Sequence, residues 1–168
     1  SGNSVDFVSS RGCPFSCSFC YNCSFNKRTW RALSAGETIR RLKNLVKKYN
    51  IKTVYFQDDN FCADLNRLKE ILKGIIKENL NIKWGTLGLR VDTAKRMDKE
   101  MLVLMEKSGC INVDIGAESG SKRILEMIDK KITTKEMLEV NKKISSYPFL
   151  IKYSFIVGFP TETKEERV

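Results

Sequence analysis

Four of the six cysteines lie close together, in the segment RGCPFSCSFCYNC at residues 11–23. Cys13, Cys17 and Cys20 have the spacing C-x3-C-x2-C, and Cys23 follows three positions later. Thiolates bind zinc and iron–sulfur clusters, and the chain contains no histidine that would share this task. The segment therefore indicates a metal site.

Zinc and an iron–sulfur cluster make different demands on this segment. A structural zinc ion takes four ligands, usually from two C-x-x-C pairs separated by a longer loop, and the sequence has no second, separate pair. Three thiolates on a short loop suit three corners of a cubane cluster, whose fourth iron is then open to a ligand from outside the protein. We therefore favour the cluster and keep zinc as the alternative.

The excess of positive charge suggests nucleic-acid binding as an alternative function. Lys and Arg number 30 against 20 Asp and Glu, a net charge of +10, which is typical of proteins that bind nucleic acids. The lysines are scattered along segments of helical periodicity, usually opposite the apolar positions, so a solvated outer face explains them better. A zinc-stabilised, basic nucleic-acid-binding module is the alternative function.

Short β-rich runs alternate with segments of helical periodicity along the chain. We predict strands at 5–8, 53–56, 82–89, 111–116 and 150–157. We predict helices at 34–49, 65–76, 98–109, 121–129 and 133–147, and the start of another at 163–166. This pattern predicts an α/β domain with a parallel sheet and outer helices, either an open doubly wound sheet or part of a β/α barrel.

Unusual residues follow every predicted strand. The first strand leads to the cysteine segment, and the others lead to QDDN (57–60), Arg90, GAESGS (116–121) and VGFPTET (157–163). Any one of these could cap a helix or form a surface ion pair. In parallel α/β folds, however, active sites lie at the carboxyl ends of the strands, so their occurrence at all five ends predicts an active site.

The motifs together resemble a known family. GCPFSCSFCYN resembles the cluster-binding loop of the radical S-adenosylmethionine (SAM) superfamily. FQDDNF, LRVD, IGAESGSKRILEMIDK and IVGFPTETKEE resemble strand-end motifs of the subgroup that includes cobalamin-binding radical SAM enzymes and their methylthiotransferase relatives. The resemblance covers essentially the whole chain and implies a partial, TIM-like (β/α) barrel of six strands. Residues 1–168 would form one radical SAM core domain that lacks the last strand, as a piece of a larger protein.

The resemblance also implies roles for particular residues. Cys13, Cys17 and Cys20 would bind three irons of a [4Fe-4S] cluster, and SAM would bind the fourth through its amino and carboxylate groups. The remaining residues would contact SAM: Tyr21 at the adenine, Asp58 and Asp59 at the ammonium group, Arg90 and Lys130 at the carboxylate, Glu118, Ser119 and Gly116 at the ribose, and Val157 and Gly158 beside the adenine.

Several conspicuous residues lie outside these roles. Cys23 follows the motif at a position where the family generally has no ligand, so we expect a bystander thiol. Cys62 and Cys110 have no motif around them, and we expect them to pack as small apolar residues. Trp30 and Trp84 are expected to contribute packing in the core or in loops.

The implied function is that of an enzyme. Reduction of the cluster would cleave SAM to methionine and a 5′-deoxyadenosyl radical, used for methyl transfer, cyclisation or a related modification of a small molecule. A tRNA methylthiotransferase, with an RNA substrate, is the alternative within the superfamily. Cobalamin would bind through a domain outside this chain, and flavodoxin or ferredoxin would donate electrons. The sequence has no run long enough to span a membrane and no signal peptide, so we expect a cytoplasmic protein.

Overall fold

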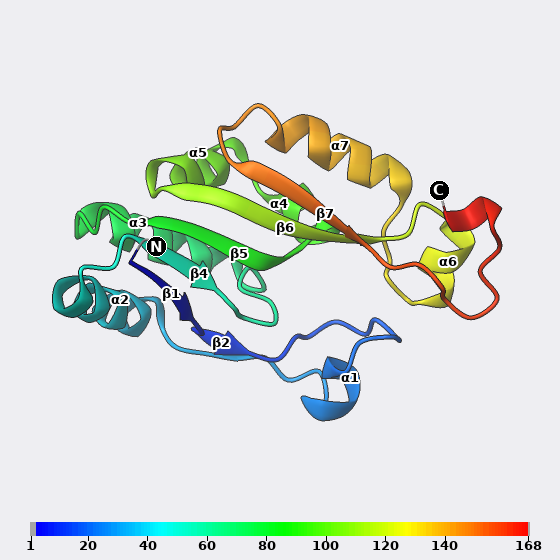
Figure 1. Cartoon of the computed structure of the whole chain (residues 1–168), viewed down its shortest axis with the longest axis horizontal. Helices are drawn as coiled ribbons and strands as arrows, with labels where there is room; N and C mark the ends of the chain where they lie inside the picture. Colours follow the sequence, from blue (N-terminus) through cyan, green and yellow to red (C-terminus); the bar gives the residue numbers. More distant parts are fainter. Residues whose placement is uncertain (1–2, 168) are drawn as a thin grey trace.

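A single parallel sheet organises the chain, of which the computed structural model describes residues 3–167 (Figure 1). Its strands are β1 (Ser4–Phe7), β4 (Thr53–Phe56), β5 (Lys83–Arg90), β6 (Cys110–Glu118) and β7 (Leu150–Phe155). They lie in the order β1-β4-β5-β6-β7, and every neighbouring pair is parallel. Every predicted strand is present, with boundaries that differ from the prediction by at most two residues.

The strand order decides between the two predicted architectures. A doubly wound sheet reverses its strand order at a switch point. Here each strand of the sheet pairs with the next one along the chain, without reversal. The sheet is therefore an arc of a β/α barrel, the partial TIM-like barrel that the sequence predicts.

The helices that the sequence predicts begin within one residue and end within three residues of the predicted bounds. They are α2 (Ala35–Tyr49), α3 (Leu65–Lys77), α5 (Lys99–Lys107), α6 (Lys122–Met127) and α7 (Thr134–Ile144). The Ser34 side chain caps α2 by accepting from the Glu37 amide, and Thr133 and Glu136 form a complete capping box on α7. Gly109 follows α5 with φ +92°, a conformation that favours glycine.

The structure contains four short elements that the sequence did not predict, and one predicted helix has a different form. The helix α4 (Val91–Arg96) follows β5 directly, and the single turn α1 (Asn22–Phe25) lies just after the cysteine motif. A two-residue ribbon pairs β2 (Ser10–Arg11) with β3 (Arg31–Ala32) in antiparallel fashion. The helix predicted from residue 163 is a 3-10 turn, η1 (Glu165–Arg167).

The core lies between the sheet and its helices. Phe56 stacks on Phe61 with ring centroids 3.9 Å apart, and the edge of buried Trp84 meets both rings. Cys62 and Cys110 are buried in this core, as predicted. Burial raises the pKa of the Cys62 thiol to about 12, so it is unreactive at neutral pH. Within residues 3–167, no helix is long and apolar enough to cross a membrane.

Candidate functional site

The cysteine segment leaves the sheet at the carboxyl ends of its strands, beyond β2, and helix α6 lies at the same end (Figure 1). The β2–β3 ribbon pairs the residues on either side of this loop and so brings its two ends, the neck of the loop, together. Gly12 lies at the neck with φ +86°, and an added Cβ would overlap the carbonyl oxygen of Thr29. Only glycine fits there, so the strand-end turn itself positions the thiols that follow.

Asp59, from the end of β4, holds one side of the loop. Its carboxylate accepts hydrogen bonds from the Gly12 amide at 2.6 Å and from the Tyr21 hydroxyl at 2.5 Å. Burial by itself would raise the pKa of Asp59, but these hydrogen bonds outweigh it, and the pKa lies below its usual value. The same hydrogen bond raises the pKa of Tyr21, whose side chain is largely exposed. Two predicted SAM-binding residues thus contact each other.

The end of α6 holds the other side of the loop. The Ser18 amide donates to the carbonyl oxygen of Ile128 at 2.9 Å, and the Ser16 hydroxyl donates to the Asp129 carboxylate. The Phe19 ring packs edge-on against Phe159, which follows β7, with centroids 5.8 Å apart. Segments that follow three different strands therefore fix the loop in place.

Two of the three thiols of the motif meet side-chain N–H donors. The Arg90 Nη1 donates to the Sγ of buried Cys17 at 3.0 Å, and the Asn60 Nδ2 donates to the Sγ of Cys13 at 3.5 Å. Among residues 3–167, no three His, Cys, Asp or Glu side chains converge on a point that one metal ion could occupy. In a cubane each thiolate binds a different iron, so a cluster does not require the three thiols to converge on one point.

Arg90 is held rigidly in this position. Its guanidinium makes two hydrogen bonds to Asp92, both of 2.9 Å, donates to the Lys130 carbonyl oxygen at 3.0 Å and stacks over the Phe15 ring. Burial would lower the pKa of Arg90, but Asp92 outweighs it, and the pKa lies above its usual value. The cation predicted for the SAM carboxylate therefore lies against the sulfur of Cys17.

Cys23 makes its hydrogen bonds within the cysteine segment. Its thiol donates to the carbonyl oxygens of Cys17, at 3.2 Å, and Phe15, at 3.7 Å. Both acceptors belong to the backbone of the same loop. That Cys23 is a bystander thiol stays a prediction.

Asp58 has a different environment from its neighbour Asp59. It is 4% exposed, and its carboxylate accepts from the Ser9 amide and from the hydroxyls of Ser9 and Ser10. These contacts join the end of β1 to the end of β4. Asp58 therefore holds the strand ends together.

Glu118 and Lys130 form a buried ion pair with 2.6 Å between Oε1 and Nζ. Their side chains are only 10% and 5% exposed. A Cβ on Gly116 would lie 2.5 Å from the Glu118 carboxylate and 3.0 Å from the Lys130 ammonium group, so glycine makes room for the pair. Two side chains predicted to contact different parts of SAM thus neutralise each other in this structure.

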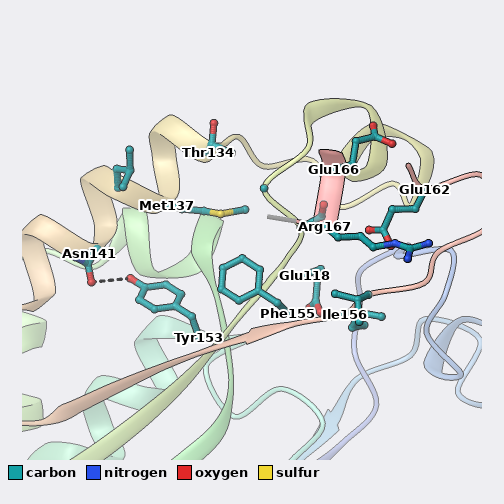
Figure 2. Close-up of a pocket in the computed structure, with 14 residues that line it drawn as sticks. Glu118, Thr134, Met137, Asn141, Tyr153, Phe155, Ile156, Glu162, Glu166 and Arg167 are labelled. Carbon is teal, nitrogen blue, oxygen red and sulfur yellow. Dashed lines mark hydrogen bonds and ion pairs between the residues drawn. The ribbon is translucent and has the colours of Figure 1, made fainter. Parts of the chain in front are cut away.

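A cavity of about 550 Å³ lies beside the end of β7, between this strand, α7 and the C-terminal turn (Figure 2). Three of the predicted residues, Glu118, Ser119 and Val157, line it, and the cysteines do not. Gly158 has φ +89°, and a Cβ there would have no protein atom within 4 Å, so only the backbone conformation demands glycine. Its amide donates to Glu162 at 2.5 Å.

The residue that the sequence analysis missed is Asn60. It ends the QDDN motif and is 1% exposed, and its Oδ1 has no hydrogen-bond partner among the described residues. Its position in a polar strand-end motif was a usable signal, but nothing in the sequence alone indicates that its amide meets the Cys13 thiol.

Known proteins resemble this chain over nearly its whole length. An uncharacterized methyltransferase of Pyrococcus horikoshii is 39% identical over 160 residues, which cover 95% of this chain and 34% of that protein. The anaerobic magnesium-protoporphyrin IX monomethyl ester cyclase of Cereibacter sphaeroides is 29% identical over 157 residues, or 92% of this chain and 25% of that protein. The chain thus spans about a third or less of the length of these relatives.

A solved structure shares the fold. The cobalamin-dependent S-adenosylmethionine radical enzyme OxsB, with aqua-cobalamin and S-adenosylmethionine bound, matches with a TM-score of 0.77 and 27% identity. The match covers 91% of this chain and 24% of that one. The sequence model of the radical SAM superfamily matches residues 7–168. With the C-x3-C-x2-C loop placed at the carboxyl ends of a partial β/α barrel, the chain belongs to the radical SAM superfamily.

Proposed function

We propose that this chain holds a [4Fe-4S] cluster and SAM for a radical SAM enzyme that transfers a methyl group to a small molecule or cyclises one. The observation that carries the proposal is the cysteine loop, which is anchored on both sides and presents Cys13 and Cys17 to N–H donors. A sulfur that binds iron is an acceptor, so donors directed at it fit a thiolate ligand.

The residues present suit an anionic cluster. Arg90 supplies a permanent positive charge at Cys17, and Cys13, Cys17 and Cys20 would bind three irons, leaving the fourth for SAM. When bound, the cluster and SAM supply reductive cleavage of SAM to methionine and a 5′-deoxyadenosyl radical. An electron-transfer protein of the flavodoxin or ferredoxin class would deliver the electron.

The hydrogen bonds and burial of each side chain decide which part of SAM we assign to it. Asp58 uses its carboxylate to join Ser9 and Ser10, so we assign the ammonium group of SAM to Asp59, which is less buried. A carboxylate with two hydrogen bonds retains lone pairs for a further donor. Glu118 and Lys130 together remain the candidates for the ribose and the carboxylate.

The names of the relatives support the proposed reaction class. One similar protein is described as a methyltransferase and another as a cyclase acting on a porphyrin ester, and OxsB is cobalamin-dependent. Of these names only that of the cyclase states a substrate, a small molecule, and it supports a small-molecule substrate over tRNA. This chain spans about a third or less of these proteins, so cobalamin would bind to a segment outside it.

Anaerobic reconstitution with iron and sulfide tests the proposal. We expect a brown protein with cubane absorbance, an EPR signal on reduction that SAM alters, and 5′-deoxyadenosine formed from SAM. Cys13→Ala, Cys17→Ala and Cys20→Ala should each lose the cluster and the cleavage of SAM. Cys23→Ala is the matched control and should retain both. Stoichiometric zinc without a cluster, or full SAM cleavage by Cys13→Ala, would contradict the proposal.

A further inference from the structure

Asn60 and Arg90 approach the cysteine loop from two different strand ends. Asn60 follows β4, and its Nδ2 lies 3.5 Å from the Cys13 sulfur; Arg90 ends β5, and its Nη1 lies 3.0 Å from the Cys17 sulfur. Neither contact is local, since the partners are 47 and 73 residues apart in sequence. No side-chain donor reaches Cys20 among residues 3–167, so the three thiols of the motif have unequal surroundings.

Both donors are buried, and other contacts fix the backbone of Asn60 and the side chain of Arg90. Asn60 is 1% exposed and Arg90 is 8% exposed. The carbonyl oxygen of Asn60 accepts from the Trp30 indole at 3.2 Å, which fixes the backbone on which the amide is mounted. Arg90 is clamped by Asp92 and the Lys130 carbonyl oxygen. Burial leaves water little access to either donor, and the other contacts of Arg90 hold its side chain in place.

We propose that Asn60 and Arg90 are positioning residues that raise the reduction potential of the cluster through N–H···S hydrogen bonds to Cys13 and Cys17. This inference rests on the proposed function. Reduction adds one electron to the cluster, and its negative charge is shared by the ligand sulfurs. A donor directed at a sulfur stabilises that charge, more strongly when the donor is a cation.

Asn60 gives the cleaner test because it forms no ion pair. Asn60→Ala removes the donor to Cys13, and Asn112→Ala is the matched control. Asn112 is a buried asparagine of β6, 7% exposed, whose side-chain amide donates to Asp114. Its contact with a thiol is through the backbone, because its carbonyl oxygen accepts from Cys110, which lies outside the cysteine motif. The two variants therefore remove the same side chain from similar burial and differ in the contact with sulfur.

The measurement is the midpoint potential of the reconstituted cluster, followed by EPR during a redox titration. A hydrogen bond of ordinary strength that favours the reduced state changes the equilibrium by up to about tenfold. We therefore expect Asn60→Ala to shift the one-electron equilibrium by up to about tenfold towards the oxidised cluster, which is a change of up to about 59 mV to more negative potential. Asn112→Ala should leave the potential at the wild-type value.

Two further variants keep the inference testable if Asn60→Ala assembles poorly. Asn60→Asp keeps the size of the side chain but loses the N–H donor, and it should lower the potential at least as much. Arg90→Lys keeps the charge but loses the planar fork, and it should lower the potential through Cys17.

The experiments distinguish failure of the proposed function from failure of this inference. A wild-type protein that binds no cluster would overturn the proposed function. A wild-type cluster with the same potential in Asn60→Ala, Asn60→Asp and Arg90→Lys would overturn this inference alone. Loss of the cluster from all three variants would also overturn it, because these side chains would then be needed for assembly and would not tune the potential.

Discussion

Removing one partner of the ion pair between Glu118 and Lys130 should destabilise the chain strongly. The charged atoms are 2.6 Å apart, and the side chains are 10% and 5% exposed, so little water can replace a lost partner. Deleting one member of a buried ion pair typically costs about 3–5 kcal/mol, because the other charge stays buried without compensation. We expect Lys130→Met to lower the free energy of unfolding by an amount in this range.

The double variant shows whether the ion pair is the cause. Glu118→Gln combined with Lys130→Met removes both charges, so it should cost less than the sum of the two single variants, by about 1–3 kcal/mol. Guanidinium unfolding of the reduced, metal-free protein, followed by far-UV circular dichroism, measures all three. Lys69→Met is the control, since its ion pair with Glu100 lies on the surface, and it should have little effect.

The reasoning would be refuted by a small or an additive result. A loss below about 1 kcal/mol for Lys130→Met would mean that water or another cation reaches Glu118. Additive single variants would mean that each side chain contributes through packing, and that the two charges do not depend on each other.

Two further predictions concern Asp59 and the buried thiol. The folded state lowers the pKa of Asp59, so this group adds stability that is complete above its unfolded pKa of about 4 and lost as the pH falls through the lowered value. Asp59→Asn should flatten the acid side of the stability–pH curve, and identical acid unfolding curves would argue against it. Burial raises the pKa of Cys62 to about 12, so iodoacetamide near neutral pH should label Cys20 in the native, cluster-free protein but leave Cys62 unmodified. Peptide mass spectrometry gives the extent of labelling, and equal labelling of the two thiols would show that the core opens.

The regular elements could be predicted because their signals are local. The capping box at Thr133 and the glycine after α5 lie within a few residues of the helix ends that they mark. The parallel strands are short β-rich runs, and their boundaries shifted by no more than two residues. Helix α4 was missed because it follows β5 directly and no capping side chain marks its start, whereas Ser121 caps the equally short α6.

The order of the strands in the sheet could not be predicted from local sequence signals. Alternating strands and helices are compatible with both a doubly wound sheet and a barrel, and the sequence left that choice open. Only the pairing of each strand with the next one along the chain decided it. Likewise the apolar strand β7 lies at an edge of the sheet, which leaves Leu150 and Phe155 exposed.

The sequence by itself determined the chemistry of the cysteine loop, because the spacing of Cys13, Cys17 and Cys20 is a property of one short segment. The tertiary structure decided which partners the strand-end residues meet. Glu118 pairs with Lys130, and Asp58 joins two strand ends. Arg90 and Asn60 donate to the sulfurs of Cys17 and Cys13. Charge and hydrogen-bonding capacity can be read from residue types, but partners tens of residues apart are chosen by the register of the strands and the path of the loops.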